Sequence, residues 1–141
     1  MAELLGREPS GDFTVAVRDE AGDPVVIRNH PFMADGTPMP TLYWLCSPQL
    51  ALSVSRLEAD GGVARAEAEV DPAELERTHR AYAIEREQLI PRDHHGPRPS
   101  GGVAGTRTGV KCLHAHYAYL LAGGDDPVGG WVERHLNRIT E

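Results

Sequence analysis

The chain has 141 residues, of which 40% are hydrophobic and 25% charged, proportions that are ordinary for a globular protein. At this length we expect a single domain spanning 1–141. The formal net charge of -7 argues against nonspecific binding to nucleic acid, whose phosphates require a basic surface. No apolar run approaches the roughly 20 residues that cross a bilayer, and the N-terminus lacks a signal-peptide pattern, so we expect a cytoplasmic protein without membrane insertion.

The first third of the sequence predicts strands. Residues 13–18 alternate apolar and polar side chains with a period of two, and the turn residues 21–24 lead into the apolar run 25–27. A second turn at 35–38 precedes 41–45, which is rich in β-branched and aromatic residues. Because the connections are short, we expect neighbouring strands to pair antiparallel.

Four helices are predicted in the rest of the chain. Ser-Pro and Asp-Pro pairs mark three of their starts, since Ser and Asp cap a helix and Pro is tolerated at its first position. The sequence thus predicts an α+β fold, with a small antiparallel sheet of about three N-terminal strands packed with about four helices. The helices are expected from Ser47-Pro48 to Gly61-Gly62, from Asp71-Pro72 to about Leu89, from about Val110 to Ala122, and from Asp126-Pro127 to near Ile139.

A long loop rich in Gly, Pro and His is predicted over 92–109, and loops of this length are usually functional or mobile. Between Arg77 and His116, seven basic side chains stand against three acidic ones, and five of the seven His lie there as well. If the protein binds a small anion, we expect it to bind in this segment.

Two titratable residues interrupt the inward-facing apolar stripe of the second predicted helix. His79 and Arg86 occupy positions where the helical period asks for apolar side chains, and each carries a desolvation cost unless it is paired. Either Arg86 forms an internal ion pair and His79 donates to a backbone carbonyl, or both side chains face a cleft and contact a ligand. His114 falls on the apolar face of the third helix, and we expect its ring to lie near that of His79.

The glycine-rich stretch 101–109 leads into the third predicted helix. Free backbone amides and the positive end of a helix dipole favour phosphate or carboxylate, and Arg107 and Lys111 add charge there. The stretch does not match a Walker A pattern, so nucleotide hydrolysis is not indicated. The alternative is a flexible loop that merely caps a helix.

A second group of candidate functional residues is centred on Cys112. Cys112 and His116 are four residues apart and have suitable spacing for two zinc ligands, but a closed structural site needs four. Alternatively, Cys112 is a free thiol in the first helical turn, acidified by the dipole, and acts as a nucleophile beside His114 or His116. Cys46, His94 and His95 could complete a zinc site only if the fold brings them to this pair.

Three stretches resemble the actinobacterial family known as domain of unknown function 501. They are Asp-Gly-Thr-Pro-Met-Pro-Thr-Leu-Tyr-Trp-Leu at 35–45, Ser-Arg-Leu-Glu-Ala at 55–59 and Val-Lys-Cys-Leu-His at 110–114. The family pattern also has a His, a Tyr and an Arg in the middle helix, which are matched by His79, Tyr82 and Arg86.

The resemblance implies a shortlist of residues but no reaction. It also implies a link to cell division or phosphate metabolism, through association with a septum-formation protein and an exopolyphosphatase. Many members carry Cys-Pro-Cys-Gly where this chain has Asp19-Glu20-Ala21-Gly22, and Thr-Cys-Pro where it has Cys46-Ser47-Pro48. Both departures weaken the zinc interpretation for this chain.

We therefore expect a small binding or regulatory module for an anion or a protein partner, with zinc as a possible cofactor. One alternative is a hydrolase or transferase with catalytic candidates Cys112, His114 and His79. The other is a structural zinc protein with Cys112 and His116 as ligands. The expected ligand-binding residues are Arg86, Arg107, Lys111, His79, Tyr82 and His114.

Overall fold

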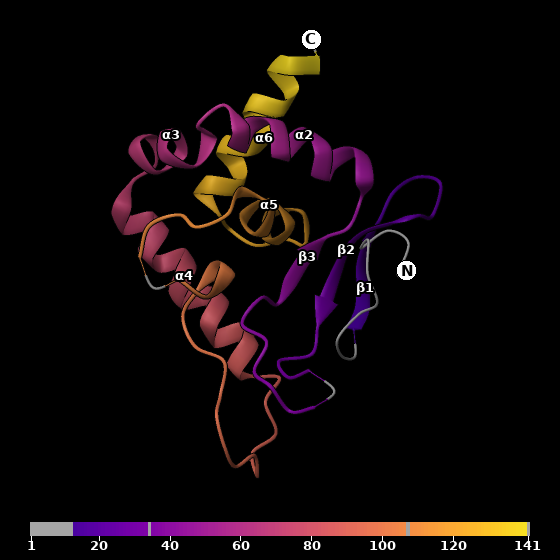
Figure 1. Ribbon diagram of the computed structural model, residues 1–141, viewed down its shortest axis with the longest axis vertical. Coiled ribbons are helices and arrows are strands. Elements are labelled where there is room, and N and C mark those ends of the chain that lie inside the picture. The colour runs from indigo at the N-terminus through magenta and orange to yellow at the C-terminus, as the bar shows by residue number, and fades with distance from the viewer. Residues whose placement is uncertain (1–12, 34, 107, 141) are drawn as a thin grey trace.

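The computed structural model describes residues 13–33, 35–106 and 108–140, with side chains up to Leu136 (Figure 1). The α+β fold expected from the sequence is confirmed. None of the helices in these ranges combines the length and the apolar composition needed to cross a bilayer. The elements in chain order are β1 (Phe13–Arg18), β2 (Pro24–Asn29), β3 (Tyr43–Leu45), α2 (Pro48–Ala59), α3 (Gly62–Glu69), α4 (Pro72–Glu87), the 3-10 helix η1 (Val103–Gly105), α5 (Leu113–Leu121) and α6 (Pro127–Thr140).

The three strands form one antiparallel sheet in the order β1-β2-β3, as their short connections predict. Ile27 of β2 pairs with Val15 on one side and with Trp44 on the other. In the central strand β2, Val26 and Ile27 are almost fully covered. The sheet therefore presents β3 at the edge that meets the helices.

The predicted helix starts of α2 and α4 are capped as expected. Ser47 accepts a hydrogen bond from the main-chain amide of Leu50, and Asp71 accepts one from Ala73. The prediction of about four helices missed α3. Gly61 takes a left-handed conformation (φ 82°), so the glycine pair expected to end a helix is a sharp corner from which α3 begins.

α5 is the central element of the fold. Figure 1 shows it seen nearly end-on, with the sheet on one side and α4 on the other. It packs against α6, β3, α2 and η1, and six of its nine residues are buried. A helix that is apolar almost all round is expected in such a position. The residues at its beginning are consequently held by several other elements.

Candidate functional site

Arg86 of α4 is only 2% exposed and ties two loops together. Its guanidinium donates to the carbonyl oxygens of Pro40 (2.8 Å) and Gly101 (2.7 Å). Its described partners are thus main-chain carbonyls and not the carboxylate of the predicted ion pair. The arginine holds the start of the glycine-rich segment against the segment that precedes β3.

His79 fixes the same segment at two further points. The amide of Val103 donates to Nδ1 (3.0 Å), so the ring hydrogen is on Nε2, which donates to the carbonyl of Gly109 (2.8 Å). Burial lowers the pKa of His79, so the ring is neutral near pH 7. A side chain at Gly102 would meet the imidazole, since a Cβ there would lie 2.4 Å from Nδ1. The predicted bond from His79 to a carbonyl is present.

Tyr82 completes this face of α4. Its hydroxyl is buried and accepts hydrogen bonds from the amides of Leu42 and Tyr43, at the start of β3. The three residues that carry the family resemblance in α4 therefore all bind main-chain groups. Their role in ligand binding stays a prediction, because the groups that they contact belong to the protein itself.

The other residues of the predicted anion site are placed differently. Lys111 is exposed, and Arg107 lies outside the described residues. Within the glycine-rich segment, the amides of Gly102 and Gly105 donate to carbonyls of the same segment. Those two amides are thus already occupied, and anion binding by this loop stays a prediction.

His116 takes the place beside His79 that was expected for His114. The rings of His79 and His116 lie 5.7 Å apart, and His116 is fully buried with Nδ1 at 2.7 Å from Asp126 Oδ2. His114, two residues earlier, points to α2 instead. The apolar pattern could not separate the two histidines, because almost every side of α5 is covered by protein.

Cys112 and His116, predicted as a pair of zinc ligands, contact different partners, since His116 binds Asp126 and Cys112 faces His114. Cys112 is the residue before the helix, with extended backbone (φ −152°, ψ 125°), so the four-residue helical spacing does not apply to it. Its Sγ lies 3.9 Å from Nδ1 of His114.

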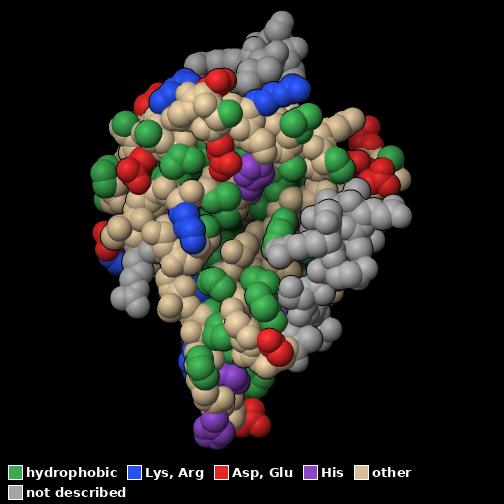
Figure 2. All heavy atoms as spheres, in the orientation of Figure 1, with side chains coloured by type: hydrophobic (Ala, Val, Ile, Leu, Met, Phe, Trp, Pro, Cys, Tyr) green, Lys and Arg blue, Asp and Glu red, His purple; other side chains and the backbone are tan. Residues whose placement is uncertain are grey.

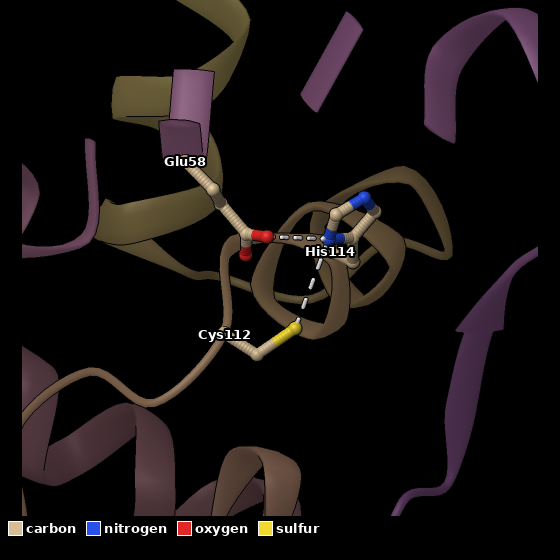
Figure 3. Close-up of side chains that lie close together, drawn as sticks. All are labelled: Glu58, Cys112 and His114. Atoms are coloured by element: carbon tan, nitrogen blue, oxygen red, sulfur yellow. Dashed lines mark hydrogen bonds and ion pairs between the residues drawn. The ribbon is translucent and has the colours of Figure 1, made fainter. Parts of the chain in front are cut away.

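Cys112 and His114 meet a third residue, Glu58 of α2 (Figure 3). Glu58 Oε1 lies 3.3 Å from His114 Nδ1, on the nitrogen that also faces the thiol. The other ring nitrogen, Nε2, lies 3.0 Å from the carbonyl of Ala51 and 3.1 Å from the hydroxyl of Ser55. A carbonyl only accepts hydrogen bonds, so Nε2 carries a hydrogen and the ring orientation is fixed.

This environment favours the imidazolium form of His114. The hydrogen bond with Cys112 is the largest of the effects that raise its pKa to about 9, and the Ala51 carbonyl and the Glu58 carboxylate add to it, whereas burial opposes it. With Nε2 bonded to Ala51 and Nδ1 facing Cys112 and Glu58, both nitrogens have acceptors when both carry hydrogens.

Glu58 was not among the residues singled out for chemistry from the sequence. It lies in the segment 55–59, which had been noted only as part of the family resemblance. Its second oxygen, Oε2, accepts from the amide of Leu113 (2.8 Å) and so caps α5. The three stretches behind the resemblance thus meet at this point, because 41–45 lines the adjoining cavity together with Cys112 and His114.

That cavity has a volume of about 390 Å³. Figure 2 shows a hollow in the middle of this face, with hydrophobic side chains gathered in it and a histidine at its upper edge. Partly exposed Cys112 therefore borders a space that a small molecule can enter. The lining residues are Thr41, Tyr43, Trp44, Leu45, Ala51, Ala104, Cys112, His114 and Ala115.

The same cluster has donors suited to a metal ion. One atom each of Glu58, Cys112 and His114 lie within 4.8 Å of one another, the only such group among the described residues. Three ligands of these types with a fourth position open are typical of catalytic zinc. Two of the further candidates lie elsewhere: Cys46 is buried after β3, and His94 stacks on Phe32.

Comparison with models of protein families gives a match over most of the chain. The model of a family described as protein of unknown function (DUF501) matches residues 15–134, which is most of the chain. No curated protein and no solved structure matches significantly.

Proposed function

The chain belongs to the DUF501 family, and we propose that it is a hydrolase or transferase in which Cys112 is the nucleophile. The observation that carries this proposal is the position of Cys112, whose thiol lies beside His114 and which borders an open cavity at the start of α5. The remaining geometry explains how the thiol becomes reactive.

The position of Cys112 favours its thiolate. The positive end of the α5 dipole and an imidazolium at 3.9 Å both stabilise a negative charge on sulfur. A carboxylate nearby would oppose this effect. However, Glu58 directs one oxygen to the amide of Leu113 and the other to His114, so its charge is partly satisfied by donors.

His114 supplies the proton that a leaving group needs. Its Nδ1 is the ring nitrogen nearest the sulfur, and its Nε2 is anchored to α2 by the Ala51 carbonyl and the Ser55 hydroxyl. A thiolate beside an oriented imidazolium is the arrangement of known cysteine nucleophiles. Glu58 takes the part of the group that orients the imidazole.

The test is the rate at which iodoacetamide alkylates the two cysteines at pH 7, followed by mass spectrometry of peptides. We expect Cys112 to react about tenfold faster than glutathione, because the start of α5 and the imidazolium of His114 stabilise its thiolate. His114→Gln should remove most of this excess rate.

Cys46 is the internal control. It is 2% exposed, and burial raises the pKa of its thiol, so it should react only on unfolding. The proposal is overturned if Cys112 in the native protein reacts no faster than glutathione, or if His114→Gln leaves its rate unchanged.

A further inference from the structure

We infer that the group transferred to Cys112 is an uncharged, apolar acyl group, of aromatic or branched aliphatic character, delivered as an ester or thioester. The inference rests on the proposed nucleophile and names the substrate class of that site. It follows from the size and the lining of the cavity beside the thiol.

The size of the cavity sets the size of the acyl group. At about 390 Å³ it has room for roughly a dozen non-hydrogen atoms, counting about 30 Å³ for each as for a water molecule. An acetyl group would fill only a small part of that space and leave the rest in contact with water. A phenylacetyl group fills most of it, together with part of the leaving group.

The lining of the cavity sets the chemistry of the group. Tyr43, Trp44 and Leu45 line the cavity from β3, and Ala104 and Ala115 line it from η1 and α5. Among the described lining residues none is Lys, Arg, Asp or Glu, and His114 is the one basic side chain. A phosphoryl group would require several cations around its oxygens, and His114 is the only one that the described lining offers.

The start of α5 can stabilise the negative charge that develops on the carbonyl oxygen of the substrate. The first amides of a helix have no partner within it, and Glu58 accepts only that of Leu113. Among the described residues, no side chain caps the next two amides of the helix, those of His114 and Ala115. Both residues line the cavity. These two amides are placed to stabilise an oxyanion next to Cys112.

The reaction balances without any cofactor. The Cys112 thiolate adds to the acyl carbon and forms the S–C bond, and the bond from carbon to the leaving oxygen or sulfur breaks. The leaving group takes the proton of His114 Nδ1. Water then adds to the thioester, giving its proton to His114, and the acid leaves as Cys112 recovers its thiolate.

Two p-nitrophenyl esters test this assignment, the phenylacetate and the acetate. The rate of acylation is measured by nitrophenolate release, and the acylated peptide is identified by mass spectrometry. We expect the phenylacetyl ester to acylate Cys112 at least about tenfold faster than the acetyl ester, relative to their rates with glutathione. Cys112→Ser should show no acylated peptide.

A filling variant tests the cavity itself. Ala51→Leu extends a side chain into the cavity and keeps the carbonyl that holds His114. It should slow phenylacetylation at least about tenfold more than it slows acetylation, because only the larger acyl group needs the space that the new side chain fills. Ala59→Leu, on the same helix but exposed, is the matched control and should change neither rate.

Binding without reaction gives an independent measurement. Trp44 lines the cavity, and the second tryptophan, Trp131, is buried in the core. Phenylacetamide, which has a poor leaving group, should change the tryptophan fluorescence of the native protein in a saturable way, and Trp44→Phe should abolish the change.

The substrate assignment is overturned if acetyl transfer is as fast as phenylacetyl transfer, if neither ester acylates Cys112, or if phenylacetamide leaves the fluorescence unchanged. If these results accompany fast alkylation by iodoacetamide, only the substrate class is wrong. Slow alkylation overturns the nucleophile as well.

Discussion

Glu58 accepts the amide of Leu113 at 2.8 Å across 55 positions of sequence, so a residue of α2 caps α5. Cys112 occupies the usual capping position, but its side chain makes no capping bond. The carboxylate of Glu58 therefore caps α5 in place of Cys112, and the thiol faces His114.

Removing this cap should destabilise the protein. We expect Glu58→Ala to lower the free energy of unfolding by about 1–2 kcal/mol, as for other capping residues. Glu58→Gln keeps an oxygen that can accept from the amide of Leu113, so this variant should lose less unfolding free energy than Glu58→Ala. Urea denaturation measures both, with Glu133→Ala on the exposed face of α6 as the control, expected within about 0.5 kcal/mol of the parent. Equal losses for Ala and Gln would contradict the role of the oxygen.

The protonation of His114 should make stability depend on pH. Its folded-state pKa of about 9 is above the value of about 6.5 expected in the unfolded chain, so the stabilisation is complete below pH 6.5 and is lost as the pH rises to 9. The charged groups that face it are Glu58 from α2 and Cys112 at the start of α5. We expect the stability difference between the parent and His114→Gln to shrink over this range. A difference that stays constant from pH 6.5 to 9 would show that the histidine does not gain a proton on folding.

Tyr82 offers a test of the scaffold behind the site. Tyr82→Phe leaves the buried amides of Leu42 and Tyr43 without the hydroxyl that accepts from them. Each unsatisfied group costs about 1–3 kcal/mol, so we expect a loss of at least about 2 kcal/mol in thermal or urea unfolding. Tyr117→Phe is the matched control, because the Tyr117 hydroxyl makes no hydrogen bond with the described residues. If Tyr82→Phe and Tyr117→Phe lose similar amounts of unfolding free energy, the hydrogen bonds of the Tyr82 hydroxyl do not stabilise the fold.

Zinc should inhibit the thiol chemistry. Zn²⁺ bound to Glu58, Cys112 and His114 would displace protons from Cys112 and His114 and would coordinate the sulfur, which could then no longer act as a nucleophile. We expect micromolar Zn²⁺ to slow alkylation of Cys112, and EDTA to restore the full rate. Glu58→Gln should need more Zn²⁺ for the same effect. If EDTA instead abolishes acyl transfer, the metal takes part in the reaction and the free thiolate is not the nucleophile.

Local signals predicted most of the fold. Ser47 and Asp71 cap their helices through amides two or three residues away, so the sequence around each is sufficient to place the helix start. α3 was missed because it buries only Gly62 and Ala66 fully, and apart from the partly buried Val63 it consists of exposed Ala, Glu and Arg, without an apolar stripe. Its start depends on the conformation of Gly61, which a Gly-Gly pair does not specify.

The candidate site could be predicted only in part. Cys112 and His114 were identified because they are neighbours in sequence and belong to residue types with distinctive chemistry. Glu58 was not, since it reaches them through the packing of α2 against α5, which no local pattern encodes. His79 and Arg86 were rightly recognised as buried exceptions, and the bond of His79 to a carbonyl was one of the predicted alternatives. For Arg86 an ion pair was predicted instead, because burial alone does not show that a guanidinium is bound by carbonyl oxygens.

The central position of α5 has a consequence for how the protein opens. After its first turn, its amides are bonded within the helix and covered by four other elements, so they should exchange with deuterium only when the whole chain unfolds. The thiol at its first turn nevertheless borders an open cavity. Reagents can thus reach Cys112 without any opening of the slowest-exchanging helix, and heating should abolish the thiol chemistry only at the temperature of global unfolding.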